Sequence, residues 1–409
     1  MASATTIQEP LAVRGPRLNR PAAFASVAAI LLTFAAAAAV PSPLYAVYQR
    51  LWGFSAATLT VIFAVYVAAL IGALLVLGAL SDHVGRRPVL VGAIALEAIA
   101  FVLFLVAGDV TTLVLARIVQ GVATGAALST LGAALIDLNP AHAPGRAGLI
   151  SGIAPVSGLA IGALGCGILV EYAPSPTHLV FVVLLLGMAL AAVAVAFIPE
   201  TAARRPGTVA SLKPRLGVPA RLRPDLLALT PIMVASWALG GLYLSLGPSV
   251  AADTFGLHNR LVGALVITLL CGCGALTSFL LRGTPTARVL AIAGTGLTVG
   301  GLISIAAMLS ENLLLAAAGT VASGIGFGAA ALASFGTLAR IAAPHERGEL
   351  MAIALVISYA AFSVPAVIAG VLAGEIGLHL TTLLYGIGVA VLGILALAAQ
   401  GLRPRPAVS

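Results

Sequence analysis

Long apolar stretches separated by short polar segments run through the whole sequence. Each stretch holds about the 20 residues that an α-helix needs to cross the hydrocarbon core of a bilayer. Helices are expected at residues 22–45, 57–80, 88–107, 111–136, 147–170, 178–198, 226–250, 260–281, 287–309, 312–338, 349–373 and 378–400. The pattern therefore predicts an all-α membrane protein with twelve transmembrane helices.

The composition excludes a water-soluble protein. Of the 409 residues, 61% are hydrophobic and only 8% are charged, whereas soluble proteins carry about 25% charged residues. The net charge of +8 does not indicate nucleic-acid binding, because Lys and Arg fall between the apolar stretches and form no basic face or arm. We expect the lipid bilayer, and no nucleic acid, as a partner.

Basic residues are shared unequally between the two sets of loops. One set holds only Arg50 and Arg260. Cytoplasmic loops carry an excess of Lys and Arg, so the richer set predicts a multi-pass protein of the cell (inner or plasma) membrane with both termini in the cytoplasm. That set comprises Arg14, Arg17, Arg20, Arg86, Arg87, Arg146, Arg282, Arg288, Arg340, Arg347, Arg403 and Arg405, and the basic residues between 204 and 223.

A polar segment at 200–225 divides the chain into six apolar stretches on each side. It is rich in Arg and Pro, and we expect it to be extended and cytoplasmic. Two interpretations remain: a tether that also fixes topology, or a segment that contacts lipid headgroups. The predicted organisation is a tail (1–21), a six-helix half (22–199), the linker (200–225), a second six-helix half (226–400) and a tail (401–409).

A weak internal repeat supports this division. Gly121 and Gly125 form a G-x-x-x-G pair in the fourth stretch, and Gly324 and Gly328 form one in the tenth. The two six-helix halves are therefore expected to be parallel pseudo-repeats, an architecture in which the substrate site lies at mid-membrane between the repeats.

The segment 78–88, Gly-Ala-Leu-Ser-Asp-His-Val-Gly-Arg-Arg-Pro, joins the second and third stretches. Its residue types predict a tight turn. Gly78 allows another helix to approach closely, Gly85 permits a chain reversal, and Pro88 can open the next helix because its missing N–H has no helical partner there.

This segment resembles the signature that the major facilitator superfamily of secondary transporters carries between helices 2 and 3. The resemblance implies that Asp82 faces the start of the eleventh helix, near Glu349, and that Asp137 shares Arg86 or Arg87 in one charge cluster. These residues, with Gly78 and Gly85, would form a gate. The alternative is an ordinary charged turn that anchors topology.

A second match to the superfamily is R-x-x-Q-G-x-x-x-G, from Arg117 to Gly125. An arginine two turns inside a span is costly in hydrocarbon and should face a cavity or a partner. In relatives this arginine is linked to proton coupling, which the resemblance implies for Arg117. The alternative is an arginine that extends its side chain to the membrane surface.

Glu97 lies near the middle of the third stretch. At 1.5 Å per residue it is roughly 14 Å beyond Pro88, in a core about 30 Å thick. A carboxyl group at that depth can take up and release a proton, so Glu97 is a second candidate for proton coupling. The alternative is a neutral glutamic acid that only bonds a neighbouring helix.

The fifth stretch carries Gly152, Pro155, Gly158, Gly162 and Gly165 at intervals of three or four residues. This spacing predicts one smooth, closely packed face, with a bend at the proline. The pattern resembles the helix 5 signature of drug:proton antiporters, although Ala154 stands where that signature has glycine. The alternative is a packing face that has no bearing on the direction of transport.

Five residues are candidates for the wall of a central cavity, where aromatic rings would stack on a lipophilic substrate: Gln120, Trp237, Tyr243, Tyr359 and Phe362. Packing against lipid or within the core is the alternative for the aromatic residues. The three cysteines lie in apolar stretches and are expected to be buried small residues. No metal ligands cluster, and no cofactor is predicted.

The sequence thus predicts a monomeric secondary transporter that works by alternating access. Its expected function is proton-driven efflux of a small lipophilic or weakly polar compound, because few charged residues lie within the spans. A proton-coupled importer of a small metabolite is the main alternative. A membrane enzyme or sensor is a remote one, since no catalytic cluster or extra domain is visible.

Overall fold

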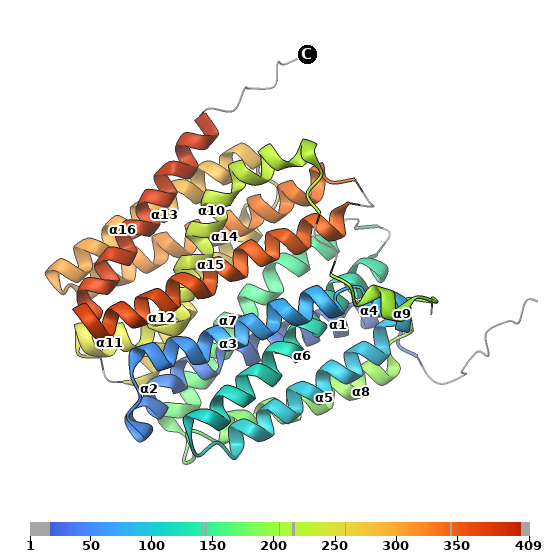
Figure 1. Ribbon diagram of the computed structural model, residues 1–409, viewed down its shortest axis with the longest axis horizontal. Helices are drawn as coiled ribbons and strands as arrows, with labels where there is room; N and C mark the ends of the chain where they lie inside the picture. Colours follow the sequence, from blue (N-terminus) through green and yellow to red (C-terminus); the bar gives the residue numbers. More distant parts are fainter. Residues whose placement is uncertain are drawn as a thin grey trace, which may run out of the picture.

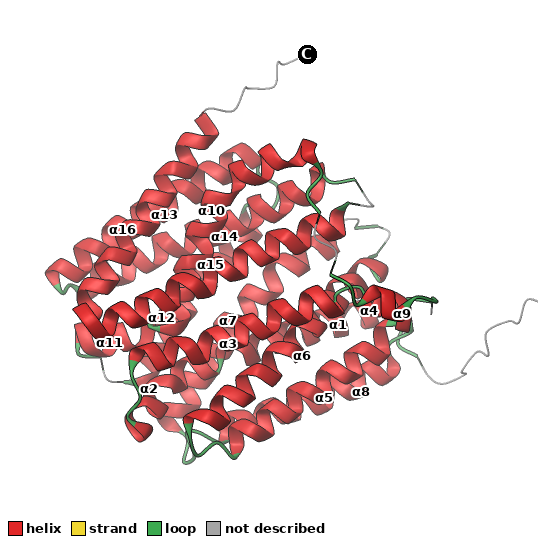
Figure 2. Cartoon of the chain, viewed as in Figure 1, coloured by secondary structure: helices red, strands yellow, loops and turns green. Residues whose placement is uncertain are grey.

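The computed structural model describes residues 17–140, 142–143, 145–203, 205–214, 217–257, 259–343 and 346–401. Arg14, Arg204, Arg215, Arg403 and Arg405, and most of each predicted tail, lie outside these residues. Within them the chain is helical and contains no strand (Figure 2).

In this described part of the chain, twelve helical segments are long and apolar enough to cross a membrane, which confirms the predicted fold class. The helices are α1 (Arg20–Ala39), α2 (Pro41–Trp52), α3 (Ala56–Leu77), α4 (Leu80–Val84), α5 (Arg86–Leu105), α6 (Val110–Asp137), α7 (Arg146–Tyr172), α8 (Leu179–Phe197), α9 (Thr208–Ser211), α10 (Arg223–Ser245), α11 (Gly247–Phe255), α12 (Arg260–Leu280), α13 (Thr286–Ser310), α14 (Leu313–Ile341), α15 (Arg347–Ile376) and α16 (Leu378–Gly401).

The first and seventh spans are longer than predicted, and each is interrupted. The first continues through α2 to Gly53, and the seventh continues through α11 to Gly256. Pro41 and Pro248 stand in the first turn after each interruption, where a proline is tolerated, so the chain remains helical beyond them. Both C-cap glycines adopt the left-handed conformation, with φ of 67° and 66°, which ends the helix.

The helices pack as an N-terminal group, α1 to α8, and a C-terminal group, α10 to α16 (Figure 1). The two G-x-x-x-G pairs serve the same purpose in each group. Gly121 lies against Tyr66 and Ala69 of α3, and Gly324 lies against Leu270 of α12. A Cβ at Gly121 would lie 2.8 Å from that of Ala69, so glycine lets the backbones approach.

The linker between the groups is not uniformly extended, contrary to the prediction. It contains α9 and a 3₁₀ turn at Ala220–Leu222. The backbone N–H of Arg205 donates to the carbonyl oxygen of His83 at 2.9 Å, and α9 packs on α4. Local backbone hydrogen bonds offset the desolvation of a segment that lies on the protein.

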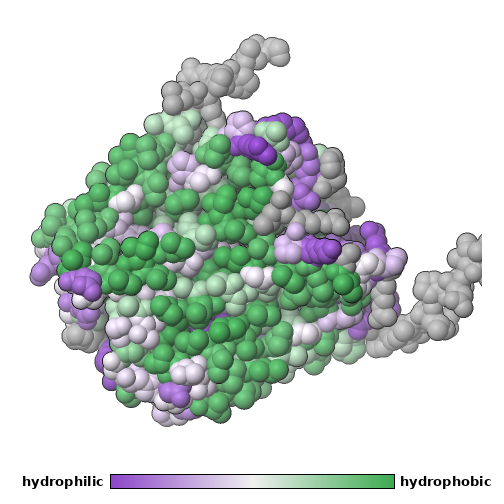
Figure 3. All heavy atoms as spheres, in the orientation of Figure 1, coloured by the Kyte–Doolittle hydropathy of each residue, from purple (hydrophilic) through white to green (hydrophobic). Residues whose placement is uncertain are grey.

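Large apolar side chains cover the outer faces of the helices. Leu190 on α8 is 71% exposed and Leu314 on α14 is 80% exposed. Hydrophilic residues gather at the end of the bundle that carries α4 and α9 (Figure 3). An apolar flank with polar ends is the surface that a bilayer requires.

Candidate functional site

The turn between α3 and α5 is built around Arg86. Its guanidinium donates to Ser81 at 2.7 Å and pairs with Asp82 at 2.5 Å and with Asp137 at 3.2 Å. Asp137 is the last residue of α6, so this arginine ties the turn to a second helix. The structure thus places Asp137 beside Arg86, and Arg87 points elsewhere, to the carbonyl oxygens at the end of α8.

The motif forms a short helix, α4, where the sequence suggested a simple tight turn. Gly85 reverses the chain with φ of 108°, as its position in the motif predicted. Gly78 does not act as predicted. Among the described residues, no atom of another helix lies within 4 Å of an added Cβ, and the nearest atoms belong to Leu74 of the same chain segment. Glycine is needed there because a Cβ would clash with the backbone of Leu74, four residues earlier.

Glu200 completes this cluster and was not among the predicted site residues. Its two carboxylate oxygens accept from the backbone N–H groups of Arg86 at 2.8 Å and Arg87 at 3.1 Å. These N–H groups are unpaired within α5, since they belong to its first turn. The sequence Pro199-Glu200-Thr201 was visible, but only the fold brings it to the start of α5.

Asp82 keeps half of its side chain exposed, at 51%, and pairs with Arg86 within the N-terminal group. Its predicted neighbour, the start of α15, is not among the contacts that the structure gives this carboxylate. Arg86 is only 12% exposed, but water reaches the Asp82 carboxylate and screens the pair. We therefore expect the pair to contribute about 1 kcal/mol or less to the stability of the turn.

A second cluster is fully enclosed in the N-terminal group. It consists of Glu97 of α5 and of Arg117 and Gln120 of α6, and each of these residues has 0% of its surface exposed. Arg117 Nη1 donates to Gln120 Oε1 at 2.6 Å, and Gln120 Nε2 donates to Glu97 Oε1 at 3.1 Å. Gln120 therefore joins two buried side chains, one acidic and one basic.

The backbone of α1 supplies a third partner. Gln120 Nε2 also donates to the carbonyl oxygen of Ala37 at 3.1 Å. In an uninterrupted helix that oxygen accepts from the N–H four residues later, but residue 41 is proline and has none. The break between α1 and α2 thus frees the acceptor that Gln120 uses.

The network retains unused hydrogen-bonding capacity. Within the described part of the chain, Glu97 Oε2 and Arg117 Nε are buried without a hydrogen-bond partner. The Arg117 guanidinium carbon lies 4.0 Å from the centroid of the Tyr66 ring, and this cation–π contact partly replaces solvation. An unpartnered carboxylate oxygen in a closed site is the place where a proton can bind.

The predicted cavity residues separate into three places. Trp237, Tyr359 and Phe362 form one aromatic cluster, with ring centroids 4.8 Å apart for Trp237 and Tyr359. Phe362 also contacts Phe63 of α3 at 5.0 Å, so this cluster lies where the two groups meet. Gln120 belongs instead to the buried network.

Tyr243 belongs neither to the aromatic cluster nor to the buried network. Its hydroxyl bonds Thr320 at 3.0 Å, and its ring lines a pocket inside the C-terminal group.

Only part of the glycine pattern on α7 packs closely. Gly158 and Gly162 lie against α1, and a Cβ at Gly158 would be 2.5 Å from the Leu32 oxygen. Gly152 and Gly165 have no neighbour within 4 Å of an added Cβ, so the single smooth face predicted for all of them is wrong. Steps of three residues drift around a helix with 3.6 residues per turn, which turns Gly152 away from α1.

The two groups meet at the end of the bundle opposite Asp82. Gly370, near the end of α15, packs on Thr60 near the start of α3, and Gly167 of α7 packs on Ala264 of α12. Glu171 accepts from Asn259 Nδ2 at 3.1 Å and from the Arg260 N–H at 3.0 Å. Small residues and polar pairs therefore hold the two groups together at this end.

Among the described residues, no three His, Cys, Asp or Glu side chains lie together as metal ligands would. The structure thus has two pseudo-repeated groups, a basic turn and a buried network of an acidic and a basic side chain. The sequence also matches a family model. The family model described as "Major Facilitator Superfamily" matches residues 23–285. This chain belongs to the Major Facilitator Superfamily.

Solved structures share the fold. A bacterial homologue of the human lysosomal transporter Spinster, described as inward-facing and unoccupied, aligns with a TM-score of 0.75 at 15% identity, over 96% of this chain and 100% of that one. A D-xylose-proton symporter gives 0.72 at 16% identity, over 92% and 96%. The nucleoside transporter NupG gives 0.69 at 11% identity, over 92% and 99%.

The family and the fold indicate a multi-pass membrane transporter rather than an enzyme. At 11% to 16% identity, these structures are similar to this chain in fold.

Proposed function

We propose that this protein is a monomeric, proton-driven exporter of a small lipophilic or weakly polar compound in the cell membrane, with both termini cytoplasmic. The observation that carries the proposal is the buried Glu97–Gln120–Arg117 network. Among the described residues, Glu97 and Arg117 are the charged side chains with no exposed surface. Such groups within a membrane are costly and usually functional.

The network suggests how protonation of Glu97 could change the position of a helix. With Glu97 ionised, its charge balances that of Arg117 through Gln120. When Glu97 binds a proton at Oε2, Arg117 loses its counter-charge, and the hydrogen bond from Gln120 to Glu97 weakens because the acceptor is neutral. Gln120 also holds Ala37, so protonation changes the restraint on α1.

A contiguous set of contacts leads from α1 to the other group. α1 packs on Gly158 and Gly162 of α7, and α7 packs through Gly167 on Ala264 of α12. Movement of α1 would therefore bias the contact between the groups. These contacts form a physical route for coupling between the network and the second group.

The conformation supports alternating access. We infer that the protein is closed at the end opposite Asp82 and open at the end that carries Asp82. Asp82 and Arg86 would face the start of α15 only in the alternate conformation, in which the Asp82 end is closed. The aromatic cluster of Trp237, Tyr359 and Phe362 would then form one wall of the substrate path. These rings contact one another and Phe63, and a wall of aromatic rings suits a lipophilic compound.

The test uses inverted membrane vesicles with an imposed proton gradient. Lipophilic cations, antibiotics and neutral metabolites are added one at a time while a pH-sensitive dye reports the gradient. Partial collapse with one compound, absent in vesicles without the protein, supports antiport and identifies a substrate class. No collapse with any compound, together with gradient-driven uptake into intact cells, would instead support the importer.

A further inference from the structure

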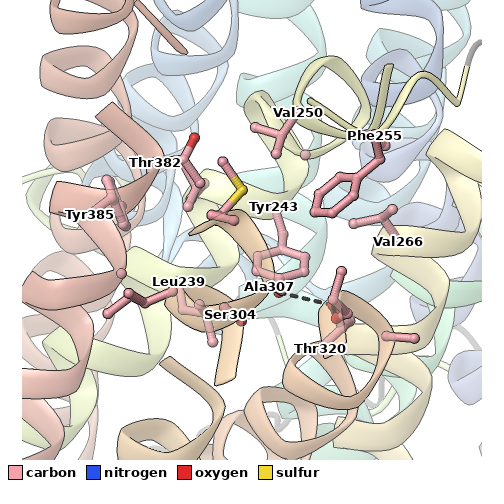
Figure 4. Close-up of a pocket in the computed structure, with 18 of the residues that line it drawn as sticks. Leu239, Tyr243, Val250, Phe255, Val266, Ser304, Ala307, Thr320, Thr382 and Tyr385 are labelled. Atoms are coloured by element: carbon pink, nitrogen blue, oxygen red, sulfur yellow. Dashed lines mark hydrogen bonds between the residues drawn. The ribbon is translucent and has the colours of Figure 1, made fainter. Parts of the chain in front are cut away.

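A pocket of about 220 Å³ lies inside the C-terminal group, with α11 in its wall, and its lining does not include Trp237, Tyr359 or Phe362. Figure 4 shows Tyr243, Phe255, Thr320 and Tyr385 around it. Residues of α10 to α14 and α16 line it, and no charged side chain is among the described lining residues. The proposed function does not use this pocket.

The pseudo-repeat reveals why this space exists. A shift of 203 residues relates the C-cap glycines Gly53 and Gly256, the N-cap residues Asp109 and Asn312, and both glycines of each G-x-x-x-G pair. The same shift carries the Glu97–Gln120 contact onto Gly300 and Ser323, which also pack together. The two groups can therefore be compared residue by residue.

Four large side chains of the N-terminal group become small in the C-terminal group. Leu44, Tyr48, Phe101 and Phe104 are each buried, at 2% exposure or less. Their counterparts under the same shift are Gly247, Ala251, Ser304 and Ala307, and all four line the pocket. The pocket thus corresponds to the volume that three aromatic rings and a leucine fill in the other half.

The chemistry of the walls selects an apolar occupant. The hydroxyl of Tyr243 bonds Thr320, and that of Tyr385 donates to the Ala238 carbonyl oxygen at 2.6 Å, so both are already satisfied. An apolar cavity of about 150 Å³ stays dry and binds benzene. Sites for drug-sized molecules measure about 300–1,000 Å³. This pocket is smaller and therefore suits part of a hydrocarbon chain better than a whole drug molecule.

The approach to the pocket is apolar as well. Leu265 of α12 and Leu313 of α14 line it and remain 43% and 49% exposed. These helices touch closely further along, where Gly328 lies against Gly274, and nearer α11 both border the pocket. We propose that the pocket binds one acyl chain of a bilayer lipid, which enters between α12 and α14.

The experiment uses the full chain, purified and placed in nanodiscs that contain phosphatidylcholine with a diazirine at the end of one acyl chain. After illumination, labelled peptides are mapped by mass spectrometry. We expect labels on residues 250–255 and 304–308. Ala307→Phe restores the ring found at Phe104, and pocket labelling should fall by about tenfold because the space is filled.

Two further variants keep the test decisive if Ala307→Phe does not fold. Ala317→Leu adds bulk at an exposed lining position on α14 and should also reduce pocket labelling. Gly388→Leu, on α16 with open space around an added Cβ, should leave it unchanged. Labelling of the exposed α8 residue Leu190 serves as the internal reference in every sample.

Two outcomes would overturn the proposal. One is pocket labelling no stronger than that of α8 in the unmodified protein, or equally strong in Ala307→Phe and Ala317→Leu. The other is labelling by a free short-chain alkyl diazirine but not by the phosphatidylcholine probe, which would assign the pocket to a small apolar solute.

Discussion

The side chain of Gln120 holds the carbonyl oxygen of Ala37, 83 positions earlier in the chain, at 3.1 Å. This bond exists because Pro41 has no N–H to offer that oxygen. The same side-chain amide donates a hydrogen bond to Glu97 through Nε2 and accepts one from Arg117 through Oε1. A helix break and a charge network are thereby joined at a single residue.

Gln120→Leu should destabilise the protein, because it leaves buried groups of Glu97, Arg117 and Ala37 unpartnered. Each such group costs about 1–3 kcal/mol, and more when charged. The loss is measured as a lowered thermal unfolding midpoint in detergent. Pro41→Ala provides an internal check: it gives the Ala37 oxygen its own helical N–H, so the double variant should lose less than the sum of the single ones. Strict additivity would contradict the link.

Glu97→Gln should abolish proton exchange while the protein remains folded. Glutamine fills the same volume and can still accept from Gln120, but it cannot bind and release a proton. Substrate-dependent collapse of a proton gradient should disappear in inverted vesicles, while exchange of labelled for unlabelled substrate continues. Gradient collapse of unchanged size would remove Glu97 from the coupling mechanism.

Glu200→Ala should lower the unfolding midpoint by loosening the junction of α4 and α5. The carboxylate accepts from the N–H groups of Arg86 and Arg87, and hydrogen bonds to a charged group are worth about 1.5–3 kcal/mol each. Glu375, an exposed glutamate near the end of α15, provides the matched control. A midpoint for Glu200→Ala equal to that of Glu375→Ala would show that the cap contributes nothing.

Gly370→Leu should force apart the end at which the two groups meet, because any side chain there overlaps Thr60. Gly374, one turn later on α15, has open space around it, so Gly374→Leu is the control. Spin labels at Leu51→Cys and Asp253→Cys, with the native cysteines replaced by alanine, report the distance between α2 and α11. We expect a longer distance for Gly370→Leu only, and equal distances in both variants would refute the packing argument.

Asp82→Asn should slow transport without altering the unfolding midpoint. The carboxylate is half exposed and its pair with Arg86 is weak, yet the proposed closing contact with α15 needs its charge. Transport rate and thermal stability are measured on the same preparation. Transport at the normal rate in the folded variant would exclude Asp82 from the gate.

Exposed acids at the helix ends have a different role. Asp109 caps α6 and accepts from the Thr112 N–H at 2.7 Å, and this bond lowers the pKa of its carboxyl below the usual range. It therefore stays ionised at neutral pH and is not a candidate for proton coupling.

The sequence by itself determined the number of membrane-spanning helices, the position of the basic turn and the presence of a repeat. Each of these depends on residues close together in the chain: apolar stretch length, glycine at a reversal, and small residues four apart. The interruptions at Pro41 and Pro248 had visible signals, but a proline in the first turn of a new helix does not stop the apolar stretch.

Only the tertiary structure decided which of these residues meet. It joined Glu97 to Arg117 through Gln120, brought Glu200 to the start of α5, and divided the predicted cavity residues among three places. It also showed that Gly158 packs on α1 while Gly152 does not. Such contacts depend on the rotation of each helix and on the side chains of its neighbours, and a pattern along one chain specifies neither.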